Sequence, residues 1–286
     1  MIKSFDELAW IDYLKSKVKT DKSVLTGIGD DCAVVSIGKE KFLLKSDMFI
    51  EGVHFELKKT TFLNIGKRAV ARVLSDFAAC AGLPIYIGAS VAGPCRQDCK
   101  YLKEILAGML FMAKKYKFSF IGGDTARAKK FFIDIWGMAK TEKPVLRSGA
   151  KTGDLIFITG RLGKRDFHRS FEPRIKEARF LTRNFKINSM IDISDGLIID
   201  LYRLAKASRK GALVLLDKVP VTKSPADLYR GEDYELIFTV DKREKRLQKL
   251  KELFYPIGEI TAKNRGYKAK TYKSLSKIKV KGYRHF

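Results

Sequence analysis

The feature that most constrains the fold of this 286-residue chain is a break in its hydrophobic pattern at residues 141–154. This segment, TEKPVLRSGAKTGD, contains Pro144 and two glycines, and it shows neither the period of a helix nor that of a strand. Segments typical of strands and helices alternate on both sides of it. The chain is long enough to bury a sizeable core in each part. We therefore predict two α+β halves, residues 1–140 and 150–286.

Apolar runs predict the strands, and apolar residues spaced three and four apart predict the helices. The expected helices are 5–18, 65–80, 98–117, 172–185 and 197–207, and the expected strands are 41–50, 119–125, 131–139, 154–160, 212–220, 234–240 and the start of 189–197. The strand at 119–125, SFIGGDT, is predicted to end in a glycine turn.

The charge balance is strongly basic, with 57 Lys and Arg against 32 Asp and Glu, a formal net charge of +25. Such a surface attracts polyanions. The basic residues are spread along the chain without an RNA-binding aromatic signature or a zinc finger, so nucleic acid is not the expected partner. A small phosphorylated substrate, or simply a Lys-rich proteome, accounts for the excess.

The location that we expect is the cytoplasm. The first ten residues lack the apolar core of a secretory signal, and no apolar run is long enough to span a bilayer, so no membrane partner is expected. The four cysteines, Cys32, Cys80, Cys95 and Cys99, are then expected to stay reduced. Cys95 and Cys99 lack the second ligand pair that a structural zinc site needs.

Acidic residues stand beside glycines at several predicted strand ends. The segments are GIGDD at 27–31, IGGDT at 121–125, DISDG at 192–196 and GEDYE at 231–235. Glycine lets the backbone approach a ligand closely. Asp47, Asp124 and Asp192 have mainly apolar flanks, so we expect them to be half-buried, where ionised carboxylates need a cation. Oxygen ligands in a chain with three histidines favour Mg²⁺ bound against phosphates.

Each acidic segment, taken alone, has an equally simple structural explanation. Asp30 and Asp31 can cap a turn, Asp195 can cap the helix at 197–207, and Asp76 can lie on a solvated helix face. It is the ordered set that favours a metal site. No phosphate-binding GxxxxGK[ST] loop, no protein-kinase element and no GxGxxG after a strand is present, so an ATP site would be built differently from those scaffolds.

Eight segments together resemble the thiamine-monophosphate kinase family, within the aminoimidazole ribonucleotide synthetase-like superfamily. In chain order they are GIGDDCAVV, SDMFIEGVHF, LSDFAACAGLP, IGGDTAR, RSGAKTGDLIFITG, IDISDGL, GEDYEL and KGYRHF, and they run from about residue 25 to the end.

The resemblance implies a two-domain α+β fold of that superfamily. The N-terminal half would bind ATP and Mg²⁺ and pair its sheet with that of a second copy into a barrel across a homodimer. The C-terminal half would be an α/β sandwich that completes the substrate site. The implied reaction is direct in-line transfer of the ATP γ-phosphoryl group to thiamine monophosphate, giving thiamine diphosphate. An ATP-dependent synthetase of the superfamily acting on another phosphorylated metabolite, and an inactive nucleotide- or RNA-binding homologue, remain the alternatives.

The resemblance also implies roles for individual residues, with several Mg²⁺ ions and no catalytic side chain, since positioning and charge neutralisation suffice for this transfer. The implied metal ligands are Asp31, Ser46, Asp47, Asp76, Asp124, Asp192 and Asp195. The implied ATP contacts are Gly123, Asp124, Arg147 and Ser194, and the implied substrate contacts are His54 and Glu232.

The chain departs from the family pattern at two informative positions. Lys45 stands where the family often has a serine ligand to magnesium. Val280 stands where we expect an aromatic residue against the thiamine heterocycle, and Tyr283 or Phe286 could supply the missing ring.

Overall fold

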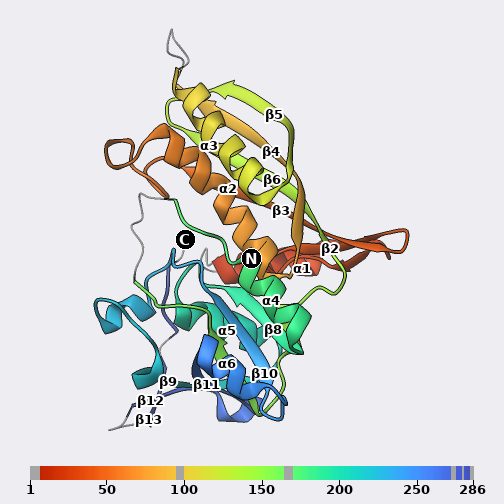
Figure 1. The fold of residues 1–286 in the computed structure, drawn as a ribbon, viewed down its shortest axis with the longest axis vertical. Coiled ribbons are helices and arrows are strands. Elements are labelled where there is room, and N and C mark those ends of the chain that lie inside the picture. The colour runs from red at the N-terminus through yellow and green to blue at the C-terminus, as the bar shows by residue number, and fades with distance from the viewer. Residues whose placement is uncertain (1–6, 95–99, 164–169, 272–274, 279, 284–286) are drawn as a thin grey trace.

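The computed structural model describes residues 7–94, 100–163, 170–271, 275–278 and 280–283 (Figure 1). The helices are α1 (Glu7–Lys17), α2 (Phe62–Ala79), α3 (Lys100–Tyr116), α4 (Ile175–Asn184), α5 (Leu197–Ala207) and α6 (Leu247–Leu253). The strands are β1 (Val24–Thr26), β2 (Ala33–Ile37), β3 (Glu40–Ile50), β4 (Leu83–Gly93), β5 (Ser119–Arg127), β6 (Phe132–Thr141), β7 (Asp154–Ile158), β8 (Ile187–Asp192), β9 (Gly211–Leu215), β10 (Leu236–Asp241), β11 (Tyr255–Thr261), β12 (Tyr267–Lys270) and β13 (Leu275–Lys277).

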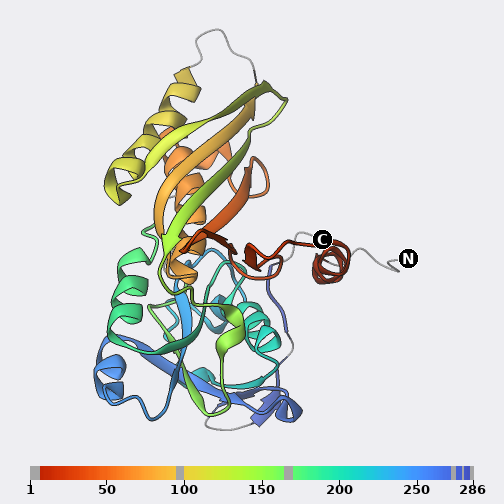
Figure 2. The same ribbon diagram turned by 90° about the vertical axis from the view of Figure 1, so that its right-hand side faces the viewer.

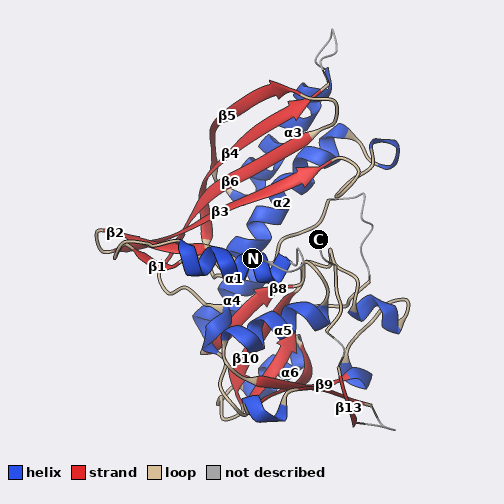
Figure 3. Cartoon of the chain, turned by 180° about the vertical axis from the view of Figure 1, so that it is seen from behind, coloured by secondary structure: helices blue, strands red, loops and turns tan. Residues whose placement is uncertain are grey.

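The N-terminal sheet has six strands in the order β1-β2-β3-β6-β4-β5. Helices α2 and α3 cover one face of it, and no described helix covers the other, which Figure 3 shows toward the viewer. Alternation along β3 explains the difference: Leu43 and Phe49 are buried under α2, whereas Leu44 and Met48 are exposed on the outer face. The predicted strand at 41–50 is thus confirmed, with one face of its sheet left bare.

The C-terminal sheet has seven strands in the order β13-β12-β9-β11-β7-β10-β8. It is covered on both faces, because successive residues of its central strands join different cores. Phe157 on β7 packs in the core that α4, α6 and α2 share, and Ile156 and Ile158 pack in a second core under α5. These central strands are apolar on both sides, as expected for a sheet between two helical layers.

Helix α2 lies where the two halves meet. The hydroxyl of Thr61 caps its first turn by accepting a hydrogen bond from the Asn64 N–H at 3.2 Å. The helix packs against β3 and α3 in the N-terminal half and against α4 and β8 in the C-terminal half. Both sheets can therefore present side chains to the same helix.

One sequence prediction is wrong: the strand at 119–125 does not end at its glycines. Strand β5 continues to Arg127, and the pairing with β4 shifts between Ile87 and Ala89, so Ile121 and Gly122 form a bulge. Gly123 has φ +159°, and a Cβ there would lie 1.6 Å from the Ala89 carbonyl oxygen. Glycine permits the bulge that we predicted as a turn.

Several elements were not predicted, among them β4, β11 and α6. Strand β4 contains Pro84 and two glycines, which break the usual strand pattern. The remaining helix and strand predictions match described elements to within a few residues. No described helix has both the length and the apolar content required to cross a bilayer. Cys32 and Cys80 are buried free thiols, and Cys95 and Cys99 lie outside the described residues.

Candidate active site

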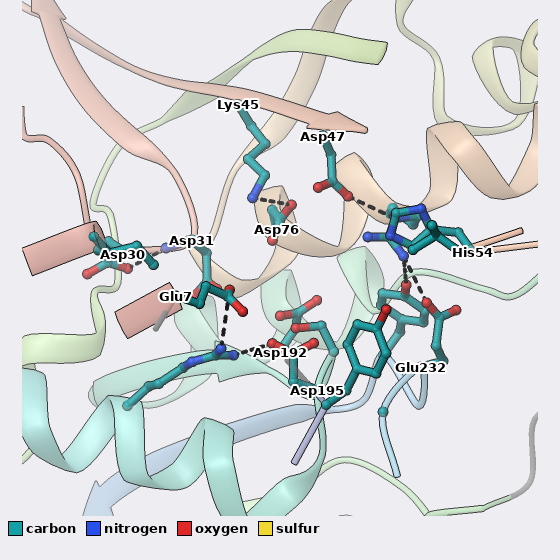
Figure 4. Close-up of a pocket in the computed structure, with 18 of the residues that line it drawn as sticks. Glu7, Asp30, Asp31, Lys45, Asp47, His54, Asp76, Asp192, Asp195 and Glu232 are labelled. Atoms are coloured by element: carbon teal, nitrogen blue, oxygen red, sulfur yellow. Dashed lines mark hydrogen bonds and ion pairs between the residues drawn. The ribbon is translucent and has the colours of Figure 1, made fainter. Parts of the chain in front are cut away.

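A cavity of about 670 Å³ opens where the two halves meet (Figure 4). Both halves line it, and so does α1, which stands beside the body at the level of this junction (Figure 2). Nine of the twelve residues singled out in the sequence lie in its lining: Asp31, Asp47, His54, Asp76, Arg147, Asp192, Ser194, Asp195 and Glu232. The tertiary structure thus gathers residues that are up to 201 positions apart, from Asp31 to Glu232.

Three buried carboxylates, those of Asp31, Asp76 and Asp192, form the centre of the site. They come from the GIGDD loop, α2 and the end of β8, and one oxygen of each lies within 4.8 Å of the other two. Burial raises the pKa of Asp192 to about 7, and the charge of Asp31 adds to that rise. Burial likewise raises the pKa of Asp76 well above its usual value, although Lys45 opposes the shift.

The donor set of this cluster fits a hard divalent cation. All three ligand groups are carboxylates, and Oδ2 of Asp31 is buried without a hydrogen-bond partner among the described residues. Carboxylates this close repel one another unless a cation or a proton lies between them. The alternative that Asp76 lies on a solvated helix face is wrong, since only 8% of the residue is exposed.

The two acidic residues of the GIGDD loop have different roles: one holds the loop together and the other lies in the cavity. Gly29 has φ +110°, a backbone conformation that residues with a side chain rarely adopt, so the loop favours glycine there. Asp30 holds the loop: its Oδ1 accepts a hydrogen bond from the Asp31 N–H at 3.0 Å, and its Oδ2 accepts one from the Arg147 N–H at 3.1 Å. Asp31 instead pairs with the Arg147 guanidinium in the cavity.

Neighbouring residues of β3 reach opposite faces of the N-terminal sheet. Lys45 and Asp47 point toward α2, where Lys45 Nζ lies 3.0 Å from Asp76 Oδ2. Ser46 points to the outer face and donates a hydrogen bond to Asp134 Oδ1 at 2.6 Å. The predicted ligands Ser46 and Asp47 are therefore on different sides of one sheet.

Gly123 and Asp124 also lie outside the lining of the cavity. They belong to β5, the exposed edge strand of the N-terminal sheet. The Asp124 carboxylate is exposed rather than half-buried, and its Oδ1 accepts a hydrogen bond from the Thr125 N–H at 2.8 Å. Within one chain, the predicted set therefore divides into a gathered group and an outer group of Ser46, Gly123 and Asp124.

The other end of the cavity is organised by Arg72 on α2. Its Nε lies 2.9 Å from Asp47 Oδ2, and its Nη1 lies 2.8 Å from both Glu232 Oε1 and the Tyr234 hydroxyl. Burial alone would raise the pKa of Asp47, but the charges of Arg72 and Lys45 and the hydrogen bond from Arg72 together lower it. His54 lines the same end, with Nδ1 accepting a hydrogen bond from the Ile50 N–H at 2.9 Å.

The DISDG segment delivers Asp192 and Asp195 in different ways. Asp192 ends β8 and accepts a hydrogen bond from Ser75 Oγ at 2.7 Å. Asp195 pairs with Arg203 and does not cap α5. That capping role belongs to Asp200, whose Oδ2 accepts hydrogen bonds from the Asp195 and Gly196 N–H groups at 3.0 and 3.1 Å.

Comparison with known proteins decides the family. Residues 29–140 match the AIR synthase related protein, N-terminal domain, and residues 150–269 match its C-terminal domain. The thiamine-monophosphate kinase of Buchnera aphidicola subsp. Schizaphis graminum is 34% identical over 96% of each chain, and that of subsp. Acyrthosiphon pisum is 32% identical over the same shares. The chain belongs to the thiamine-monophosphate kinase family. The resemblance inferred from the eight segments is confirmed.

A solved member of the thiamine-monophosphate kinase family has the same fold. The structure of AaThiL complexed with AMPPCP and TMP matches with a TM-score of 0.84 at 27% identity, and the match covers 98% of this chain and 97% of that chain. The α+β fold class implied by the resemblance is thereby confirmed.

Tyr283 lines the main cavity, together with Phe55 and Tyr234, whereas Val280 does not. Val280 faces a small apolar recess that Tyr202 and Tyr267 also line. Tyr283 lines the main cavity, and its N–H donates a hydrogen bond to the Asp195 carbonyl at 3.0 Å, which docks the C-terminal segment. Tyr283 is thus one of the two residues that we expected could supply the missing ring, and the other, Phe286, lies outside the described residues.

Sequence reasoning missed Arg72, which contacts Asp47, Glu232 and Tyr234 at this end of the cavity. A signal was present: Arg72 is a charge inside the apolar run AVARVL of a predicted helix. Buried arginines require carboxylate partners. The partner that identifies its role, Glu232, lies 160 positions away and could not be read from that run.

Proposed function

We propose that this protein transfers the γ-phosphoryl group of ATP to thiamine monophosphate, producing thiamine diphosphate and ADP. The observation that carries the proposal is the buried cluster of Asp31, Asp76 and Asp192, built by both halves of a chain that is 34% identical to a thiamine-monophosphate kinase. The related AaThiL structure is a complex with AMPPCP and TMP, an ATP analogue and the acceptor.

We propose that Mg²⁺ is held at this cluster. Asp31, Asp76 and Asp192 would be its principal ligands, and Asp195 lines the same cavity for a further ion. When bound, Mg²⁺ neutralises phosphate oxygens and lets two anionic groups approach each other. The unpartnered Oδ2 of Asp31 and the raised pKa of Asp192 support this assignment, because both mark buried carboxylate oxygens that a cation would stabilise.

The side chains of the cavity would then position the two substrates. Arg147 can exchange its contact with Asp31 for a phosphate oxygen of ATP, since a guanidinium binds either group. Ser194 also lines the cavity, and its carbonyl accepts a hydrogen bond from the Glu232 N–H at 2.7 Å, so we place Ser194 where the two substrates meet. We assign thiamine monophosphate to the end away from Arg147, near His54, Glu232 and Tyr283, whose ring can stack on a heterocycle. No general base is required, because the attacking atom is already an anionic phosphate oxygen.

We propose a homodimer that uses the outer face of the N-terminal sheet. This face exposes large apolar side chains, which a solvated monomer surface seldom gathers on one sheet: Leu44, Met48, Ile121, Phe132 and Trp136. Pairing two such faces would bury them by two-fold symmetry and form the expected barrel. Ser46, Gly123 and Asp124 lie on this face or at its edge, so we assign them a nucleotide contact at the border with the partner subunit.

The assay that tests the function is incubation of the purified protein with ATP, Mg²⁺ and thiamine monophosphate. We expect thiamine diphosphate and ADP in equal amounts, separated by chromatography. Absence of thiamine diphosphate at saturating substrates would rule the proposal out. ADP release with another phosphorylated metabolite, and not with thiamine monophosphate, would instead identify a synthetase of the same superfamily.

A further inference from the structure

We propose that the ammonium group of Lys45 takes the place of one divalent cation among the carboxylates of Asp76 and Asp47. This inference rests on the proposed function only in assuming that the Asp31–Asp76–Asp192 cluster binds a divalent ion. The chain would then hold one Mg²⁺ fewer than a variant with a small hydroxyl residue at position 45. Lys45 thereby acts as a positioning residue that sets how many metal ions the site contains.

Both the backbone and the ammonium group of Lys45 are held in place. Its backbone lies in the middle of β3, directly after Leu44, which pairs with Ala33 of β2, and opposite Gly137 of β6. Its Nζ lies 3.0 Å from Asp76 Oδ2, and the two side chains are only 24% and 11% exposed. Figure 4 shows Lys45 reaching from β3 toward Asp76, with Asp47 beside it on the same strand. A positive charge is therefore already built into the metal cluster.

Three carboxylates of the cavity each pair with a different cationic side chain. Arg147 pairs with Asp31, Arg72 with Asp47, and Lys45 with Asp76. Among the described residues, Asp192 forms no salt bridge and receives one hydrogen bond, from Ser75. The negative charge left for a divalent ion is thus concentrated at Asp192 and at the unpartnered Oδ2 of Asp31.

The ammonium and a second divalent ion cannot share Asp76. A protonated amine has no lone pair for a metal, and its charge repels a metal ion at contact distance. Lys45 differs in this respect from Arg147, which reaches the ATP side of the cavity and has phosphate as an alternative partner. We expect one ion near Asp31 and Asp192, and none between Asp76 and Asp47.

The test counts Mn²⁺ ions bound per chain in the presence of AMPPCP, by electron paramagnetic resonance of free Mn²⁺. The variants are Lys45→Ser, which adds a ligand oxygen, and Lys45→Met, which removes the charge without adding one. Lys140→Ser is the matched control, since Lys140 pairs with Glu40 in the same sheet and both side chains are about half exposed. We expect one more Mn²⁺ in Lys45→Ser than in wild type, and no additional ion in Lys45→Met or Lys140→Ser.

Thermal unfolding without metal gives a second measurement. Removing the ammonium leaves Asp76 uncompensated, so both Lys45 variants should unfold several degrees below wild type. Mg²⁺ should recover this loss in Lys45→Ser and not in Lys45→Met. If Lys45→Ser does not fold, Lys45→Thr carries the same hydroxyl and serves in its place.

One result would overturn the proposal: an equal Mn²⁺ count in wild type and Lys45→Ser. If Lys45→Ser then also binds AMPPCP more weakly than wild type does, Lys45 is a phosphate ligand instead. Neither measurement depends on turnover. If wild type makes no thiamine diphosphate but the Mn²⁺ counts are as expected, only the kinase assignment is refuted. If wild type makes thiamine diphosphate but the Mn²⁺ counts are equal in wild type and Lys45→Ser, only the role of Lys45 is refuted.

Discussion

The two faces of the N-terminal sheet show how one strand can serve two different purposes. On the face toward α2, Lys45 and Asp47 enter a network of ion pairs that joins both halves of the chain. On the outer face, Leu44, Ser46 and Met48 are exposed. The strand is the same, and only the parity of the residue number differs. The inner face is a site completed within one chain, whereas the outer face has the composition of a surface that another protein covers.

The difference shows that burial, more than residue type, distinguishes the face that lines the cavity from the face that we propose pairs with a second copy. A buried carboxylate needs a cationic partner. Lys45 on the inner face, Arg72 on α2 and Arg147 after β6 are these partners. An exposed carboxylate, such as Asp124, has water and needs none. The inner face is therefore sensitive to single charges, and we expect the outer face to be sensitive to apolar contact area.

The largest effect is expected from Asp192→Asn, which removes the one carboxylate of the Asp31–Asp76–Asp192 cluster that forms no salt bridge among the described residues. Its kcat should fall by about 10²- to 10³-fold, the scale for losing a preorganised electrostatic contact. The metal-free fold should be retained or slightly stabilised, because an amide carries no buried charge. Steady-state kinetics and thermal unfolding check both expectations. Glu172→Gln, at a surface ion pair, is the control, and near-normal turnover in Asp192→Asn would exclude a metal role for that residue.

The next effect is expected from Arg72→Met, which leaves Asp47 and Glu232 without a shared partner. Breaking a buried ion pair from one side costs about 3 kcal/mol of unfolding free energy. Denaturant unfolding measures it. Arg243→Met is the contrast, since Arg243 pairs with Asp241 at 83% exposure and its loss should leave the unfolding free energy nearly unchanged. Equal losses of unfolding free energy in the two variants would show that the buried ion pairs of Arg72 stabilise the fold no more than an exposed pair does.

A smaller effect is expected from Met48→Glu on the outer face. A charge in an apolar interface should weaken the proposed dimer about 30-fold, because the carboxylate would lose its water on association. Sedimentation equilibrium measures the dissociation constant. Leu253→Glu, at an equally exposed apolar residue of α6, should leave it unchanged. If wild type is monomeric at micromolar concentration, the outer face does not pair two copies.

The smallest effect is expected from Tyr283→Leu, which removes the aromatic ring at the substrate end. The KM for thiamine monophosphate should rise about 3- to 10-fold, the value of one ring contact, while the KM for ATP stays the same. Tyr255→Leu, at a tyrosine outside the cavity, is the matched control. A parallel rise in both KM values would place Tyr283 elsewhere than against the acceptor.

Sequence reasoning predicted the fold better where patterns are local. The helix at 197–207 was predicted with the bounds of α5, and the strand at 41–50 differs from β3 by one residue. Strand β4 was missed because its glycines and Pro84 are acceptable only where neighbouring strands hold them. The bulge at Gly122–Gly123 was predicted as a turn, since a glycine pair has the same local signature in both.

The residues of the candidate site were likewise predicted better where the signal is local in the sequence. The acid-glycine segments contain Asp31 and Asp192, and the family resemblance added Asp76, although Asp31 and Asp76 each also had a structural explanation. Arg72 and the capping role of Asp200 were missed, because their partners are known only after the chain has folded.

By itself, the sequence determined the family, most of the helices and strands, and the acidic residues that a site could use. The tertiary structure alone decided which of those acids meet. Helix α2 covers one face of β3 and also contacts β8, so Asp47, Asp76 and Asp192 converge, and Ser46 is turned away. The physical reason is that side-chain direction alternates along a strand, while the identity of the covered face depends on a helix packed from elsewhere in the chain.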